Sequence, residues 1–353
     1  MVEFRKDFET AEPYKVAGRT TYNLGDNENR LIDWSFLAAE TLQSLETKEL
    51  TFYGDNRYAD LLEAYAAYVH VRPEQLTVGV GSDFLIHMII TAFLTNEDIF
   101  LTVNPDFFMY QVYNTMHGSQ FESVDLDWVN GSLSLSADKV LAHAQAVGAK
   151  VIMLSNPNNP SSIAHDSQEL EKIIANFSGL VVIDEAYIEF ADCPSFVEKI
   201  NDYDNLIVLR TLSKAFGLAG VRLGFAVANE RLVYEINKVI PPYSLSNLAS
   251  RMGTVALGHT GQVLDCIEDI KGLRQDFLAF LNNLPGVQVL PSQASFVAFT
   301  APWAAQLHQE ATSKGWNFKY YPQGRLTNYI RMSIGRPEEM KLMKEMIEKL
   351  VEA

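Results

Sequence analysis

Four segments of the sequence place polar side chains directly after short apolar runs that are typical of buried β-strands. They are Gly81-Ser82-Asp83 after LTVGV, Asn156 to Asn159 after VIML, Asp184 to Tyr187 after VVI, and Thr211 to Lys214 after LIVL. In an open α/β sheet, ligands bind beyond the carboxyl ends of the strands, where loops and helix N-termini converge. We therefore expect these segments to meet in one site.

Lys214 has the most unusual surroundings of these residues, because RTLSKAFGLAGVRLGF places it among small and apolar side chains. A lysine in a partly dry site can lose its proton and attack a carbonyl carbon to form a Schiff base. Considered alone, a surface lysine is the commoner case. A catalytic role for Lys214 therefore depends on whether other candidate site residues lie beside it.

Asp184 and Tyr187 are candidates for the same pocket. Asp184 ends the apolar run LVVID, where a carboxylate either serves a site or acts as a helix cap or ion-pair partner. Tyr187 follows three residues later and either offers its phenol to that site or packs in the core.

A phosphate group would suit a second set of residues. Ser82 and Ser213 offer hydroxyls near predicted helix starts, where backbone N–H groups bind anions, although serines there are usually caps. Arg222 follows Lys214 by eight positions across a Gly-rich turn, and Thr211 adds another hydroxyl. A guanidinium group supplies charge and a fork of donors.

The elements that must position these residues alternate between strands and helices. LTVGVG, DIFLTVN and KVIMLSN are each followed by a helical stretch, through His87, from Phe107 and from Ser167. This alternation predicts an α/β fold with a parallel sheet covered by helices. LVVIDE, NLIVLR and VRLGFAVA are apolar enough to be central strands buried on both faces, and we expect the sheet to be mixed near them.

A second, smaller α/β domain is predicted after Pro241-Pro242. Long amphipathic helices there flank the short strands SFVAF and YIRMSIG, and the last helix starts at Pro337. We expect an N-terminal arm over 1–30, a large domain over 31–240 and a small C-terminal domain over 241–353.

Composition narrows the possible partners. The 353 residues are 48% hydrophobic and 20% charged, with a formal net charge of −16 and no Lys/Arg-rich block. Nucleic acid and anionic membranes are therefore poor partners. Cys193 and Cys266 have neither metal-site nor disulfide spacing, and neither MVEFRKDFET nor FLIHMIITAFL predicts a signal or a membrane span. We expect a cytoplasmic protein without a metal site.

The motifs taken in order resemble the fold-type-I pyridoxal-5′-phosphate (PLP)-dependent aminotransferases, and among them the histidinol-phosphate aminotransferase branch. The matching segments include LGDNEN, FYGDNRYADLLEAYA, VGVGSDFLI, NPDFFMY, LSNPNNPSS, VVIDEAYIEF, RTLSKAFGLAGVRLGF, PPYSLSNLA, SQASFVAF and NYIRMSIGRPEE. The resemblance implies a mostly parallel, seven-stranded type of sheet with a smaller α/β domain. It also implies PLP as the cofactor, a role in amino-acid and specifically histidine biosynthesis, and a homodimer with shared active sites.

The resemblance also implies residue roles. Lys214 would carry PLP through a Schiff base and move a proton, Asp184 would pair with the pyridinium nitrogen, and Tyr187 would hydrogen-bond the ring oxygen. Asn159 would share that oxygen, and Phe107 would stack on the ring. The phosphate would be held by Ser82, Asp83, Thr211, Ser213 and Arg222, together with Tyr53 of the partner subunit. Arg331 would clamp an anionic group of the substrate.

Departures from the family pattern concern the substrate. Lys319 stands where this branch usually has a second arginine for the substrate phosphate, and Arg325 is a possible substitute in space. A lysine binds phosphate as a point charge without the fork geometry. Asn29 and Arg30 are further candidates for orienting the substrate. Other departures are Phe84, Ser161-Ser162, Ser244 and Ser295. The amino donor therefore stays open between histidinol phosphate, an aromatic amino acid and others. We expect 2-oxoglutarate to accept the amino group and become glutamate.

Other functions have weaker support. A Rossmann dehydrogenase would need a glycine at Phe84 in GVGSDF, and no GxxxxGK[ST], GxSxG or HExxH motif is present. A decarboxylase resembling L-threonine-O-3-phosphate decarboxylase would use the same Lys214 and Asp184 and differ in how the substrate is oriented. A ligand-binding regulator built on an inactive aminotransferase domain is disfavoured by the intact lysine.

Overall fold

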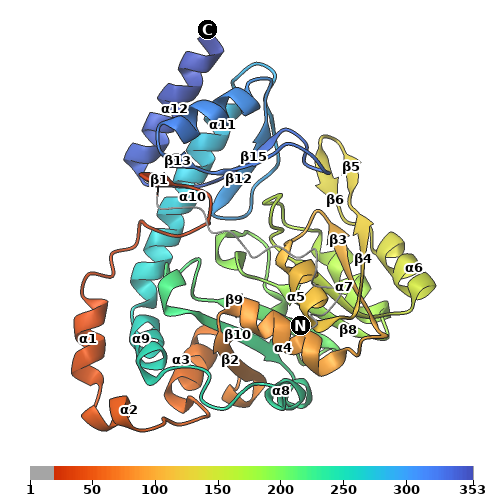
Figure 1. The fold of residues 1–353 in the computed structure, drawn as a ribbon, viewed down its shortest axis with the longest axis vertical. Coiled ribbons are helices and arrows are strands. Elements are labelled where there is room, and N and C mark those ends of the chain that lie inside the picture. The colour runs from red at the N-terminus through yellow and green to blue at the C-terminus, as the bar shows by residue number, and fades with distance from the viewer. Residues whose placement is uncertain (1–19, 353) are drawn as a thin grey trace, which may run out of the picture.

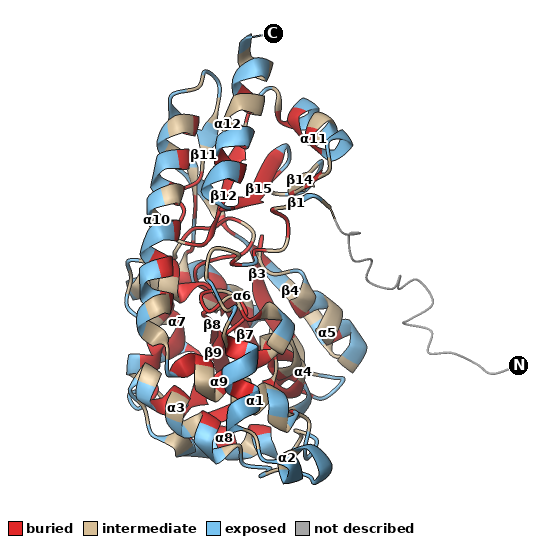
Figure 2. Ribbon diagram, turned by 90° about the vertical axis from the view of Figure 1, so that its left-hand side faces the viewer, coloured by how far each residue is buried: buried red, intermediate tan, exposed pale blue. Residues whose placement is uncertain are grey.

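The computed structural model of this chain describes residues 20–352, so residues 1–19 of the predicted arm and residue 353 lie outside the described residues. A large helix-covered sheet occupies one end of the molecule and a small sheet the other (Figure 1). The long helix α10 (Thr260–Asn282) runs beside both parts (Figure 2). The predicted boundaries at residues 30 and 240 stay predictions.

The large sheet has seven strands in the order β2-β10-β9-β8-β7-β3-β4. The strands are β2 (Leu76–Val80), β3 (Ile99–Asn104), β4 (Gln120–Asp125), β7 (Ala149–Ser155), β8 (Leu180–Asp184), β9 (Leu206–Thr211) and β10 (Leu223–Ala228). Only β10 runs antiparallel to its neighbours, and the other adjacent pairs are parallel. The mostly parallel sheet is confirmed, and it is mixed at the expected VRLGFAVA segment.

The central strands are buried on both faces, as their continuous apolar sequence predicts. Successive side chains of a strand point to opposite faces. In β8, Val181 and Ile183 belong to the core on one face, whereas Val182 belongs to the core on the other. One face is covered by α4 (Ser82–Phe93), α5 (Met109–His117) and α8 (Glu230–Asn237). The other is covered by α3 (Ala59–Val69), α6 (Ala137–Val147), α7 (Ser167–Asn176) and α9 (Asn247–Leu257).

Helix α5 begins two residues later than expected. The Asp106 carboxylate accepts a hydrogen bond from the Phe107 backbone N–H at 2.7 Å, which fixes a turn between β3 and the helix. Phe107 therefore lies in the loop at the end of β3 and not in the helix. This placement leaves its ring at the carboxyl edge of the sheet.

The small sheet is antiparallel, with the order β11-β12-β15-β14. Its strands are β11 (Gln288–Val289), β12 (Phe296–Thr300), β14 (Lys319–Tyr321) and β15 (Tyr329–Ser333), and helices α10, α11 (Ala304–Ser313) and α12 (Pro337–Glu352) pack beside them. The strands predicted from SFVAF and YIRMSIG are present. Strand β1 (Tyr22–Asn23) pairs with β13 (Trp316–Asn317), so the start of the described chain lies on this small part.

The remaining elements are short. They are α1 (Leu37–Ser44), α2 (Thr47–Thr51) and the hairpin of β5 (Asp127–Val129) and β6 (Ser132–Ser134). In residues 20–352, no helix combines the length and the apolar character needed to cross a membrane.

Candidate active site

A cavity of about 460 Å³ lies where the carboxyl ends of the large sheet's parallel strands face the small sheet. It is lined by the predicted residues Ser82, Asp83, Phe107, Asn159, Asp184, Tyr187, Thr211, Ser213, Lys214, Arg222, Lys319 and Arg331. Two other predicted site residues, Asn29 and Tyr53, do not line it. Residues from all four strand-end segments therefore meet in one place, as the parallel sheet requires.

Lys214 follows β9 and presents its amine to the cavity. The side chain is half-buried, Nζ donates to the Asp26 carbonyl at 3.0 Å, and Nζ lies 5.8 Å from the centre of the Tyr187 ring. The backbone just beyond it is fixed by two side chains of the N-terminal segment. Asn29 donates to the Ala215 carbonyl at 2.9 Å, and the Trp34 indole donates to the next carbonyl at 2.6 Å.

Asp184 is a buried carboxylate at the end of β8. Its Oδ2 accepts a hydrogen bond from the Tyr110 hydroxyl at 2.9 Å, and its Oδ1 accepts one from the Ala186 N–H at 3.2 Å. Burial raises the pKa of Asp184 to about 6, although the Tyr110 hydrogen bond opposes this rise. A carboxylate held in this state is suited to a cationic N–H partner that enters from the cavity.

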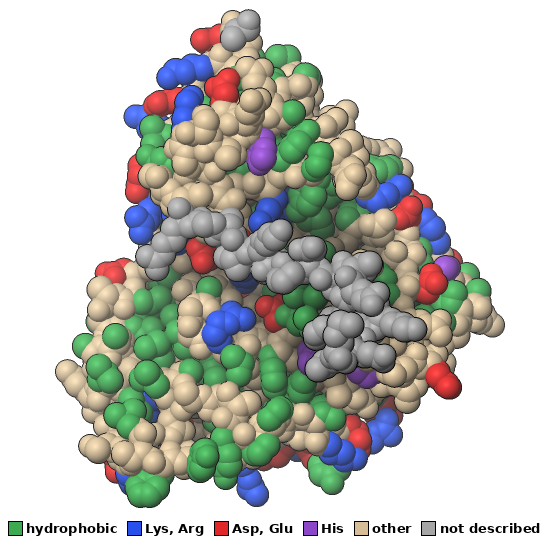
Figure 3. Space-filling view, viewed as in Figure 1, with side chains coloured by type: hydrophobic (Ala, Val, Ile, Leu, Met, Phe, Trp, Pro, Cys, Tyr) green, Lys and Arg blue, Asp and Glu red, His purple; other side chains and the backbone are tan. Residues whose placement is uncertain are grey.

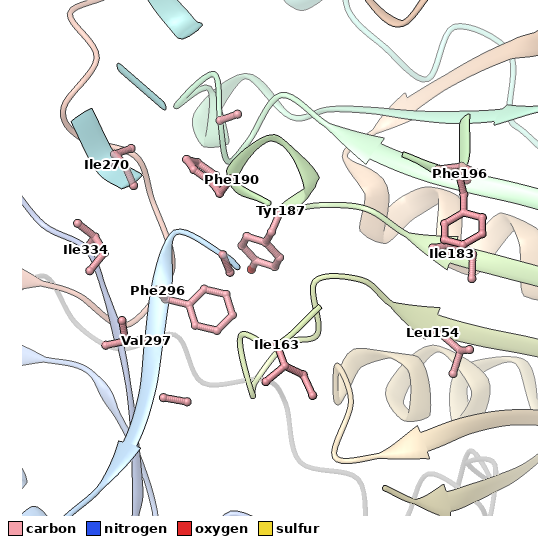
Figure 4. Packing of buried hydrophobic residues seen from close by; sticks show 14 of the residues in the cluster. Leu154, Ile163, Ile183, Tyr187, Phe190, Phe196, Ile270, Phe296, Val297 and Ile334 are labelled. Atoms are coloured by element: carbon pink, nitrogen blue, oxygen red, sulfur yellow. The ribbon is translucent and has the colours of Figure 1, made fainter. Parts of the chain in front are cut away.

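Tyr187 presents a fixed hydroxyl beside Lys214. Asn27 donates to the Tyr187 hydroxyl oxygen at 3.0 Å, and the Asn27 backbone N–H donates to Ser333 of β15 at 3.0 Å. The Tyr187 ring meets Phe296 of β12 edge to face at 5.0 Å, where the large and small parts touch (Figure 4). The hydroxyl is therefore positioned by both parts of the molecule.

A corner of the cavity at the start of α4 carries the Arg222 guanidinium. Arg222 has a left-handed backbone (φ 61°), its Nη1 donates to the Ala219 carbonyl at 3.1 Å, and its Nη2 lies 3.6 Å from the Asp83 carboxylate. A Cβ atom at Gly81 would lie 2.5 Å from Nη2, and Gly81 has a φ of +84°. Glycine is thus required there. The Arg222 guanidinium and the N-terminus of α4 at Ser82 together suit a phosphate.

Two cations face the same cavity from the small sheet. Lys319 of β14 and Arg331 of β15 are directly opposite each other in the antiparallel register, so their side chains share one face. Arg331 is buried, its Nη1 donates to Asn159 Oδ1 at 2.6 Å, and its Nη2 donates to the Gly25 carbonyl. Its Nε has no partner among the described residues. This pair can bind one or two anionic groups.

Asn29 and Arg30 are engaged elsewhere. Asn29 is buried behind the lysine segment, where it contacts Cys266 as well as the Ala215 carbonyl. Arg30 forms a bidentate pair with Glu339 at the start of α12, with N–O distances of 2.9 and 2.8 Å. Both residues therefore anchor the N-terminal segment instead of facing the cavity.

Arg325 and Tyr53 also lie away from the cavity of their own chain. Arg325 donates to the Leu126 carbonyl and lies 3.7 Å from the Asp125 carboxylate, so it does not replace a substrate-binding arginine in this arrangement. Tyr53 is 82% exposed and stacks on Tyr243 at 4.6 Å.

Several residues of the site were missed by the sequence analysis. They include Asp26, whose carbonyl accepts from Lys214, Ser155 and Tyr321, which line the cavity, and Tyr110 and Asn27, which donate to Asp184 and Tyr187. Tyr110 lies in NPDFFMY and Asn27 in LGDNEN, so these motifs contained the signal. Tyr321 lies two residues after Lys319 in β14, so both side chains point to the same face of the sheet. The β14–β15 hairpin, which sets that direction, was not predicted.

Comparisons with known proteins agree with this geometry. The model of the family "Aminotransferase class I and II" matches residues 19–350. A histidinol-phosphate aminotransferase of Clostridium novyi is 32% identical over 337 residues, covering 95% of this chain and 94% of the relative.

Two solved structures share the fold. A histidinol-phosphate aminotransferase from Sinorhizobium meliloti, in complex with pyridoxal-5′-phosphate, superposes with a TM-score of 0.87 at 21% identity over 99% of both chains. L-threonine-O-3-phosphate decarboxylase from Porphyromonas gingivalis has a TM-score of 0.79 at 21% identity, covering 94% of this chain and 100% of that one. At such identities the likeness concerns the fold alone.

Proposed function

This chain belongs to the class I and II aminotransferases, and we propose that it is a PLP-dependent transaminase that exchanges an amino group between a histidinol phosphate-like donor and 2-oxoglutarate. The observation that carries the proposal is the convergence of Lys214, Asp184 and Arg222 on one cavity. Sequence relatives above 30% identity, such as that of Clostridium novyi, bear the name histidinol-phosphate aminotransferase, which supports transamination over decarboxylation.

The donor groups of the cavity fit PLP in charge and kind. Arg222, Ser213 and the α4 N-terminus at Ser82 would hold the phosphate, because they combine a guanidinium, a hydroxyl and free backbone N–H groups. Asp184 would keep the ring nitrogen protonated, because its buried carboxylate is stabilised by the positive charge of the protonated ring. When bound, PLP draws electrons away from the bonds at the substrate Cα.

The protein side chains supply the proton transfers and the orientation. Lys214 Nζ would form the covalent attachment and then move a proton at the substrate Cα, and the Asp26 carbonyl holds this amine at the cavity wall. The Tyr187 hydroxyl and Asn159 would hold the ring oxygen, and the Phe107 ring would cover one face of the ring. These roles agree with the positions of all these side chains on the cavity surface.

The substrate would be held by the two cations of the small sheet. Arg331 is suited to a carboxylate, because its guanidinium is fixed by Asn159 and the Gly25 carbonyl. Lys319 lies beside it as a compact charge on a flexible stem, which suits a second anionic group such as a phosphate ester.

A homodimer is part of the proposal, and Tyr53 is its main support. Tyr53 is exposed and does not line the cavity of its own chain, so it would reach the phosphate site of a second copy. It lies in an apolar patch made of Leu50, Phe52, Tyr53, Tyr243 and Leu248, all at least 40% exposed. Figure 3 shows hydrophobic side chains gathered on the lower left of the molecule, over the region of α1 and α2. Exposed patches of this kind mark protein interfaces.

A cytoplasmic location and the division at residues 30 and 240 are retained in the proposal. The two separate sheets support a division into two parts, although α9 (Asn247–Leu257), which follows residue 240, packs on the large sheet.

The proposal is tested by an amino-donor screen of the PLP-loaded protein against 2-oxoglutarate. Histidinol phosphate, aromatic amino acids and phosphothreonine are compared, and both glutamate and CO2 are measured. We expect glutamate from histidinol phosphate without CO2, and we expect Lys214→Ala to lose both turnover and the visible absorbance of the lysine-bound cofactor. Release of CO2 from phosphothreonine without glutamate, or full activity of Lys214→Ala, would contradict the proposal.

A further inference from the structure

Asp106 is a half-buried carboxylate in the loop behind the cavity, and both of its oxygens are used. Oδ1 accepts from the Phe107 N–H at 2.7 Å and from the Ser155 hydroxyl. Oδ2 accepts from the Thr102 hydroxyl at 3.1 Å and from the Ser155 N–H at 3.3 Å. Asp106 does not line the cavity, yet it joins the ends of β3 and β7, which carry Phe107 and Asn159.

We infer that Asp106 is a positioning residue that fixes both the cofactor-covering ring of Phe107 and, through Ser155 and Asn159, the substrate-clamping Arg331. This inference rests on the proposed function, because the proposed function assigns PLP to Phe107 and the substrate to Arg331. It adds a residue with no contact to either ligand.

The first branch of this network runs through Ser155. A hydroxyl has one hydrogen, and Ser155 gives it to Asp106, so its lone pairs remain to accept from other groups. Ser155 Oγ accepts from the Asn159 N–H at 3.1 Å and from Asn158 Nδ2 at 3.2 Å. Asn159 Oδ1 then accepts from Arg331 Nη1 at 2.6 Å. Ser155 and Asn159 therefore link the Asp106 carboxylate to the Arg331 guanidinium.

The second branch runs through the backbone of Phe107. The hydrogen bond from its N–H to Asp106 sets the turn before α5 and hence the direction of the Phe107 ring. That ring meets Tyr110 edge to face at 5.5 Å, and Tyr110 in turn donates to Asp184. This branch reaches the cofactor side of the cavity without passing through Ser155.

The network requires a group at position 106 that can accept a hydrogen bond at each of its two oxygens. The Phe107 and Ser155 backbone N–H groups can only donate, and they approach different oxygens of the carboxylate. An asparagine of the same size would set its NH2 group against at least one of them. Hydrogen bonds to charged groups are strong enough for their loss to change a binding constant roughly tenfold.

The test uses Asp106→Asn, Ser155→Ala and the double variant, with Asp98→Asn as the matched control. Asp98 is partly exposed, and its carboxylate accepts only local hydrogen bonds, from Thr95. Each protein is measured for kcat, for KM and equilibrium affinity towards 2-oxoglutarate, and for the PLP dissociation constant from quenching of intrinsic fluorescence in the cofactor-free protein.

We expect Asp106→Asn to raise both the 2-oxoglutarate KM and the PLP dissociation constant roughly tenfold. Ser155→Ala should raise the KM similarly and leave PLP binding within about twofold, because only the first branch is cut. The double variant should have the KM of Asp106→Asn alone, since the two residues act in series. Asp98→Asn should match the wild type.

Unchanged KM in Asp106→Asn, or additive effects in the double variant, would overturn the inference. If Asp106→Asn does not fold, Ser155→Ala decides alone, and a wild-type KM in that variant overturns the first branch and with it the inference. A wild-type protein that binds PLP but transfers no amino group would instead refute the proposed function. The two binding constants would then still test Asp106 separately.

Discussion

Replacing Asp184 by asparagine should change how the stability of the cofactor-free protein depends on pH. The Asp184 carboxylate is buried and has only the Tyr110 hydroxyl and the Ala186 N–H as hydrogen-bond partners in the described chain. Burial raises its pKa from 3.8 to about 6. The folded protein thus binds a proton more tightly than the unfolded chain does. Asparagine keeps the shape and removes this titration.

The sign and the size follow from that difference in pKa. Because the folded pKa is raised, the stability linked to protonated Asp184 is fully present below about pH 4 and is lost as the pH rises through about 6. The folded and unfolded pKa values of Asp184 differ by about two. This difference corresponds to ~3 kcal/mol of stability lost when Asp184 ionises completely. About half of it, on the order of 1 kcal/mol, falls between pH 5 and pH 8.

The assay is urea unfolding of both cofactor-free proteins at several pH values from 5 to 8. The free energy of unfolding of wild type, relative to Asp184→Asn, should fall by roughly 1 kcal/mol over this range. Asp106, whose pKa burial raises to about 7, titrates in both proteins and cancels in the comparison. Asp98→Asn serves as the control, because the hydrogen bonds from Thr95 lower the Asp98 pKa.

The cofactor supplies the second half of this test. A cationic ring nitrogen beside Asp184 removes the cost of its ionisation, so the pH-dependent gap should shrink when PLP is bound. Parallel pH profiles of wild type and Asp184→Asn in the absence of PLP would refute the reasoning from burial. A gap that persists in the PLP-bound proteins would refute the pairing of Asp184 with the ring.

Three further substitutions separate the remaining roles. Arg331→Lys should raise the 2-oxoglutarate KM by roughly tenfold or more because the guanidinium fork is lost, with little change in PLP affinity; equal effects on both would contradict the clamp. Lys319→Ala should weaken a phosphorylated donor more than 2-oxoglutarate in steady-state kinetics, and equal losses would remove Lys319 from phosphate recognition. Tyr53→Ala should weaken PLP binding several-fold in fluorescence titrations of the cofactor-free protein. Unchanged affinity would contradict the shared site.

The parallel sheet explains why so much of the cavity could be expected from sequence. Each of the four polar segments ends a buried strand, and neighbouring parallel strands end at the same edge. Asp184 and Lys214 therefore converge although they lie on separate elements. Arg222 joins them because it directly precedes β10, which runs antiparallel and so begins at that edge. Here a local pattern, an apolar run followed by polar residues, fixes a long-range arrangement.

Contacts across the chain could not be predicted in this way. Asn29 contacts Ala215, 186 positions away, and Arg30 pairs with Glu339, 309 positions away. No local periodicity distinguishes a residue that faces the cavity from a neighbour that anchors the segment. Only the packing of the N-terminal segment against both parts of the molecule decides between the two.

Because side chains alternate along the strands, the residues that line the cavity and those that support it from below point to opposite faces of the large sheet. Asp184 shares the β8 face of Val182 and meets Tyr110 of α5, whereas Glu185 points to the opposite face. There Arg210 of β9 lies between Glu185 at 3.1 Å and Glu189 at 2.7 Å, all with little exposure of their side chains.

Buried ion pairs contribute little net stability but hold a fixed geometry. Arg210 directly precedes Thr211, and Glu185 directly follows Asp184, so this pair ties together the ends of β9 and β8. The residues that would bind PLP are thus held in register by their immediate neighbours in sequence, which face away from the site. Loss of the guanidinium in Arg210→Met would leave two buried carboxylates without an ionic partner, although Glu185 would keep its hydrogen bonds from Ser195 and the Phe196 N–H. The change should therefore disturb the cavity residues at the ends of β8 and β9.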